Sequence, residues 1–135
     1  MYTTNYFNAF ITVSDDCTVS IAKTPLQTVK LSAVNIAFEI ISNNPYQYTS
    51  DEVLFQIYVL KNNIHEADRN SEKQKFFSKG QACFRASPLA KRYGWGVHFN
   101  AEGKMALYAL ESEEYQKLSQ DKNLKIIKAM RTKRG

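Results

Sequence analysis

The sequence predicts an α+β fold in which a mainly antiparallel sheet is covered by helices on one face. Residues 95–109 alternate apolar and polar side chains around a glycine-containing turn, which is typical of a β-hairpin. Residues 28–42 and 50–62 carry helix signals, and these helices are expected to cover the sheet. The chain has 135 residues, of which 44% are hydrophobic and 23% charged. We therefore expect a single domain over residues 1–135, whose basic end at 132–135 frays.

The first strand and the first helix follow from residue type and spacing. Residues 5–13 are rich in aromatic and β-branched side chains, which favours a strand, and turn formers end it at residues 14–16. From Thr28 the apolar residues recur at steps of three and four, which predicts a helix to residue 42. Pro45 prevents this helix from continuing. The recurring positions are Leu31, Val34, Phe38 and Ile41.

The second helix is predicted from its start. Thr49 and Glu52 have the spacing of a capping box, in which each side chain binds the free backbone N–H of the other residue. The following apolar run would also fit a strand alternating through Val53, Phe55, Ile57 and Val59, and the cap favours a helix to Asn62. Residues 66–78 are charged until Phe76 and Phe77, which predicts an exposed helix anchored at its far end.

Residues 81–86 alternate and are predicted as a strand that ends at Pro88. Such a strand would divide the side chains between its two faces. One face would carry Ala82, Phe84 and Ala86, and the other Cys83, Arg85 and Ser87. Residues 89–93 are expected to form a basic loop.

The register of the hairpin follows from its turn, residues 100–104, where Gly103 suits the left-handed position of a three-residue loop. Closing the turn with Asn100 opposite Lys104 pairs Phe99 with Met105. The pairing then continues residue by residue to Trp95 with Ala109. One face then carries only apolar residues, Trp95, Val97, Phe99, Met105, Leu107 and Ala109. The other carries Gly96, His98, Lys104, Ala106 and Tyr108. A slip of one residue would mix the two sets, which supports this register and places Trp95 in the core.

The C-terminal part reads as one helix and one ambiguous segment. Ser112 is expected to cap a helix with Glu113 and Glu114 in its first turn, where carboxylates favour the helix dipole. Residues 124–131 fit either a helix or a closing strand. We favour the strand, because the chain often returns to the sheet edge after such a helix.

The net charge of +5 is concentrated in two basic blocks. Residues 73–104 contain seven Lys or Arg against one acid, and residues 122–134 contain six with no acid, whereas the remaining chain is acidic. This distribution suits an anionic partner. The sequence has no signal-peptide pattern and no membrane-spanning run, so a cytoplasmic protein without a membrane partner is expected. Cys17 and Cys83 are expected to be free thiols, and neither a metal site nor a cofactor is expected.

The favoured function is a non-catalytic binding domain for a small anionic ligand or an acidic partner. Arginine suits bidentate contact with phosphate or carboxylate, and a tyrosine can stack on a ring. The glycines at 94 and 96 would let a ligand approach the backbone. In the alternative reading, Arg85 satisfies carbonyl groups and the glycines serve close packing against an aromatic ring. The predicted ligand-binding residues are Arg85, Lys91, Arg92, Tyr93 and His98.

Two further functions are weighed. A thiol-dependent hydrolase or transferase would use Cys83 as nucleophile and His98 as base, with Asp51 or Glu52 as the orienting acid. A weak nucleic-acid binder would use the basic loop and the tail. Tyr93 alone does not supply the repeated aromatic platform of single-strand binders, which disfavours this last reading.

The sequence also resembles a family of small bacterial proteins classed as a domain of unknown function. The most specific part is the run Arg-Ala-Ser-Pro-Leu-x-Lys-Arg-Tyr-Gly-Trp-Gly at residues 85–96, and the segments 3–6, 44–46, 48–55, 76–81 and 103–108 contribute to the resemblance. It implies a bacterial, cytosolic, single-domain protein. It implies no reaction, cofactor or catalytic residue.

Overall fold

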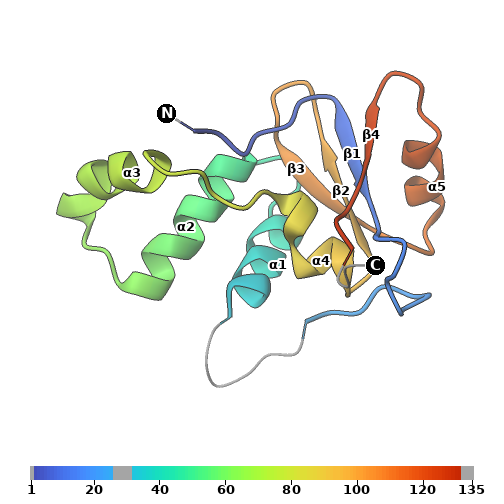
Figure 1. Ribbon diagram of the computed structural model, residues 1–135, viewed down its shortest axis with the longest axis horizontal. Helices are drawn as coiled ribbons and strands as arrows, with labels where there is room; N and C mark the ends of the chain where they lie inside the picture. The colour runs from blue at the N-terminus through green and yellow to red at the C-terminus, as the bar shows by residue number, and fades with distance from the viewer. Residues whose placement is uncertain (1, 26–31, 132–135) are drawn as a thin grey trace.

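The protein has an α+β fold built on a four-stranded mixed sheet, as the computed structural model shows for residues 2–25 and 32–131. The strand order is β3-β2-β1-β4, and β1 is antiparallel to β2 and parallel to β4 (Figure 1). The strands are β1 (Ala9–Thr12), β2 (Trp95–Phe99), β3 (Met105–Ala109) and β4 (Lys125–Lys128). The predicted α+β class is thus confirmed, and the ambiguous C-terminal segment forms a strand.

The described residues form five helices and two short 3₁₀ turns in addition to the sheet. α1 and α4 pack on one face, α2 packs on α1, and α3 lies at the far end from the sheet (Figure 1). The helices are α1 (Ala33–Asn43), α2 (Ser50–Asn62), α3 (Arg69–Phe77), α4 (Pro88–Lys91) and α5 (Glu113–Ser119), and the 3₁₀ turns are η1 (Glu66–Asp68) and η2 (Phe84–Ala86). None of the helices within residues 2–25 and 32–131 is long and apolar enough to cross a membrane.

The predicted helical cover on one face of the sheet is confirmed, and α5 lies against the other face. Ala9 and Ile11 of β1 join the core with α1, so the alternating side chain of Phe10 points the opposite way. The rings of Phe10 and Tyr115 of α5 meet at 5.1 Å, and the Tyr115 hydroxyl accepts a hydrogen bond from the backbone N–H of Val13. A buried Phe10 requires a cover on this side, and α5 supplies it.

The hairpin register is confirmed at all five predicted pairs, from Phe99 with Met105 to Trp95 with Ala109. Gly103 has a φ of +80°, as the predicted turn requires. The core face packs against α1, where the rings of Trp95 and Phe38 lie 5.3 Å apart. The hairpin therefore leaves the side chain of His98 on the α5 side of the sheet.

The helix starts follow the predicted signals with one shift. Thr49 and Glu52 form the capping box, and Ser112 caps α5. α1 begins at Ala33, where the Ser32 hydroxyl accepts a hydrogen bond from the N–H of Asn35. The part of the predicted helix at 28–31 and the predicted fraying of 132–135 fall outside the described residues.

The predicted strand over residues 81–86 is wrong. The turn η2 forms instead, with local backbone bonds from Ala86 to Cys83 and from Ser87 to Phe84. Phe84 is buried in the core, while the position beside β1 is taken by β4. The predicted basic loop at 89–93 is also corrected, since Ser87 and Pro88 start the short helix α4 there.

Candidate anion-binding site

Arg85 lies on η2 and reaches the end of β4. Its Nε donates a hydrogen bond to the carbonyl of Lys128 at 2.7 Å, and its own carbonyl accepts one from the N–H of Met130 at 2.9 Å. The side chain is exposed, and its terminal nitrogens bind no partner among the described residues. Arg85 therefore binds a carbonyl, as the alternative reading expects, but only through Nε. The terminal fork is left available for another acceptor.

Two further cations, Lys128 and Arg131, lie at the end of β4. The Nζ of Lys128 lies 2.9 Å from one carboxylate oxygen of Asp15, and Nη2 of Arg131 lies 3.8 Å from the other. The hydrogen bond from Lys128, more than any other cause, lowers the pKa of Asp15. Lys128 and Arg131 therefore pair with one carboxylate, and Arg85 reaches the same end of β4 through the Lys128 carbonyl. We call Arg85, Lys128 and Arg131 the β4 basic cluster.

This cluster joins the two basic blocks of the sequence. Arg85 belongs to the block at 73–104, and Lys128 and Arg131 belong to the block at 122–134. The backbone bonds between η2 and the end of β4 hold the two segments together. Sequence reasoning named Arg85 but missed Lys128 and Arg131. The sequence signal for Lys128 and Arg131 is that no Asp or Glu lies among residues 122–134.

Lys91, Arg92 and Tyr93 lie at a different place, the C-terminal end of α4. The N–H of Arg92 binds the carbonyl of Pro88 at 2.8 Å, and the carbonyl of Tyr93 accepts a bond from the N–H of Lys23 at 2.8 Å. No hydrogen bond or ion pair joins these side chains to Arg85 within the described residues. Arg85 thus lies on η2, whereas Lys91, Arg92 and Tyr93 lie at the end of α4.

His98 occupies a third place, on the face of β2 that α5 covers. Its Nδ1 lies 2.8 Å from the hydroxyl of Tyr46, which lies 2.7 Å from the hydroxyl of Tyr108. Burial lowers the pKa of His98, opposed by the charge of Asp121. Burial and the bond with Tyr108 raise the pKa of Tyr46. Tyr46 was missed from the sequence, because it follows Pro45 in a segment without periodicity.

The lowered pKa of His98 predicts a pH-dependent stability. Below the ordinary value of 6.5, the unfolded chain takes up a proton that folded His98 resists, so the free energy of unfolding falls as the pH drops through this range. We expect urea unfolding at neutral pH and at about pH 5 to show this loss, and His98→Gln to reduce it. His65→Gln, at an exposed position, serves as the control. An unchanged pH dependence in His98→Gln would contradict the assignment.

Cys83 and His98 do not come together. The sulfur of Cys83 lies 3.2 Å from the hydroxyl of Tyr6, whose ring packs on Phe99 at 5.2 Å on the core face of the hairpin. His98 projects from the opposite face, so the sheet separates the proposed nucleophile from the proposed base. Burial, followed by the hydrogen bond with Cys83, raises the pKa of Tyr6 to about 12.

The two acids considered for that reaction are also engaged elsewhere. The Asp51 carboxylate accepts hydrogen bonds from Thr3 and Thr4, and Glu52 closes the capping box of α2. No catalytic triad is therefore assembled around Cys83 in the described residues.

Comparison with known proteins gives a family without an assigned activity. No curated protein and no solved structure matches the chain. One family model, described as a family of unknown function (DUF6157), matches residues 1–135. The resemblance noted in the sequence is thereby confirmed as family membership, although the model supplies no ligand and no reaction. The chain belongs to this family of unknown function, DUF6157.

Proposed function

We propose that this chain is a non-catalytic binding domain whose β4 basic cluster receives a carboxylate or phosphate group of an acidic partner. The observation that carries the proposal is the state of Arg85. Its Nε is fixed on the carbonyl of Lys128 at 2.7 Å, while the terminal nitrogens are exposed and unengaged within the described residues. An arginine held in this way loses less freedom when its fork binds an oxyanion.

The surroundings of Arg85 support an acceptor of negative charge. Lys128 and Arg131 share the single carboxylate of Asp15, so the cluster keeps an excess of positive charge. The cluster is exposed, which favours a group carried by a larger acidic partner over an enclosed small ion. Electrostatic attraction of this kind is screened by salt, over about 8 Å at physiological ionic strength. The affinity should therefore fall as the salt concentration rises.

The test is a binding titration with three probes: inorganic phosphate, a short polyglutamate peptide and single-stranded oligothymidylate. We expect the polyglutamate peptide to bind, and Arg85→Gln to weaken it by about tenfold, equivalent to about 1.4 kcal/mol. Arg85→Lys should recover only part of the loss, because lysine keeps the charge without the fork. Arg69→Gln, an exposed arginine on α3, is the matched control.

Arg92→Gln distinguishes the β4 basic cluster from the basic residues at the end of α4. A loss from Arg92→Gln with no loss from Arg85→Gln would place the binding at the end of α4 and overturn the assignment to the β4 basic cluster. Binding of none of the probes would reject the proposal. Preferential binding of oligothymidylate would instead support the nucleic-acid alternative.

A further inference from the structure

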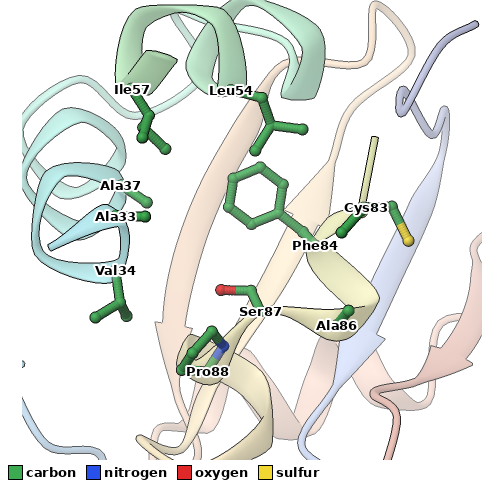
Figure 2. A pocket seen from close by; sticks show the side chains of 11 residues that line it. Ala33, Val34, Ala37, Leu54, Ile57, Cys83, Phe84, Ala86, Ser87 and Pro88 are labelled. Carbon is green, nitrogen blue, oxygen red and sulfur yellow. The ribbon is translucent and has the colours of Figure 1, made fainter. Parts of the chain in front are cut away.

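A small apolar hollow lies on the opposite side of η2 from the β4 basic cluster. Its volume is ≈ 180 Å³, and α1, α2 and the segment 82–88 line it (Figure 2). Figure 2 shows Ala33 and Ala37 of α1 facing η2 across this space, with Leu54 and Ile57 of α2 at its upper end. Small side chains on α1 and in the segment 82–88 leave room between elements that are otherwise closely packed.

One polar group is directed at this space. The Ser87 hydroxyl oxygen points from the start of α4 towards α1 (Figure 2). This oxygen accepts a hydrogen bond from the N–H of Leu89 at 3.2 Å, and its hydrogen has no acceptor among the described residues. The sulfur of Cys83 is directed away from the hollow, towards Tyr6. Ser87 can therefore donate one hydrogen bond to an occupant.

Among the described residues, those that line the hollow include no charged side chain. Arg85 lies between two lining residues in sequence, but its guanidinium is held on the carbonyl of Lys128 at the end of β4. An anion placed in the hollow would lose its hydration without gaining a cation, which is unfavourable. The hollow therefore selects against the ligands proposed for the β4 basic cluster.

We propose that this hollow binds a compact neutral molecule, mainly apolar and carrying one hydrogen-bond acceptor that meets the Ser87 hydroxyl. A protein cavity of about 150 Å³ lined by aliphatic and aromatic side chains holds benzene, so the space here fits a single ring or a short acyl group. Apolar burial supplies the affinity, and Ser87 fixes the orientation. The proposal is independent of the anion site.

The experiment follows the methyl resonances of Leu54, Ile57 and Val34 by NMR during titration with acetophenone, benzene or benzoate. Acetophenone combines a ring with a carbonyl acceptor, benzene lacks the acceptor, and benzoate adds the charge. We expect saturable shifts confined to these methyl groups, with benzoate at least about tenfold weaker than acetophenone. Shifts of equal size for benzoate, or shifts spread over surface methyl groups, would overturn the proposal.

Two variants locate the binding. Ala33→Leu places a larger side chain at the exposed rim of the hollow and is expected to abolish the acetophenone shifts. Ala67→Leu, the same change at an exposed position of η1, should leave them intact. Ser87→Ala should reduce acetophenone binding to the level of benzene. Because Ser87 also caps α4, its effect is read as the ratio between the two probes, which a general loss of stability does not alter. Unchanged acetophenone binding in Ala33→Leu would reject the hollow as the site.

Discussion

Replacing Gly96 with alanine is expected to destabilise the protein by about 2–3 kcal/mol, the upper part of the range for overpacked cores. A Cβ atom at this position would lie 2.5 Å from Cζ of Phe10 and 2.7 Å from Cε2 of Tyr115. Phe10 is fully buried in the sheet, and Tyr115 anchors α5 through its bond with the N–H of Val13, so neither ring can move freely. The strain should fall on the contact between α5 and the sheet.

Urea unfolding and thermal melting measure this effect. Gly80→Ala is the matched control, because its Cβ would meet nothing closer than Tyr2 at 3.9 Å. Phe10→Leu in the background of Gly96→Ala should return part of the lost stability, since the smaller side chain vacates the contested space. If Gly96→Ala unfolds at the same urea concentration as Gly80→Ala, the packing described for this face is wrong.

Gly96 also shows what the sequence could and could not predict. The glycines beside Trp95 had two readings, access for a ligand or close packing against an aromatic ring. Gly96 packs against Phe10 and Tyr115, which are 86 and 19 positions away by residue number. Gly94 has a φ of +81°, and its Cβ would lie 2.9 Å from Val19. The packing reading therefore holds for Gly96, through partners that no local pattern identifies.

The hairpin was predictable because its information is local. Alternation over residues 95–109 and one turn with Gly103 determine the register, so all five pairs could be written down from the sequence. Residues 81–86 alternate just as clearly and form no strand. Alternating side chains indicate that a segment has one apolar and one polar face. The segment becomes a strand only where another strand is available to pair with it. β1 pairs with β2 on one edge and with β4 on the other, so residues 81–86 pair with neither edge of β1.

The candidate site was only partly accessible for the same reason. The shape of its side chain singles out Arg85, but Lys128, whose carbonyl it binds, and Asp15, which pairs with Lys128, lie 43 and 70 positions away. His98 was grouped with Arg85 on the basis of charge and proximity in sequence. The sheet instead gives His98 the hydroxyl of Tyr46 and leaves Arg85 at the end of β4. Composition and proximity in sequence thus do not show which of these residues the fold brings together.

Replacing Asp51 with alanine is expected to cost about 2–3 kcal/mol and to loosen the N-terminal segment from α2. One carboxylate oxygen of Asp51 accepts bonds from the N–H and the hydroxyl of Thr4, and the other accepts one from the hydroxyl of Thr3, all at 2.7 Å. Thr4 is buried, so alanine would leave its N–H without an acceptor. Unfolding in urea should show the loss, with Asp68→Ala at an exposed position as control.

The consequence of this change should extend to Cys83. Residues 3–5 lead directly to Tyr6, whose hydroxyl lies 3.2 Å from the Cys83 sulfur, so a loosened segment would expose the thiol. We expect Asp51→Ala to speed labelling of Cys83 by a thiol reagent, followed by mass spectrometry. Asp51→Asn keeps the oxygen that serves Thr4 and presents an amide to Thr3, so it should restore most of the stability and the slow labelling. Equal effects of Asp51→Asn and Asp51→Ala would show that the charge, rather than the pattern of acceptors, holds the segment. Labelling unchanged in both variants would mean that Tyr6 protects Cys83 without help from Asp51.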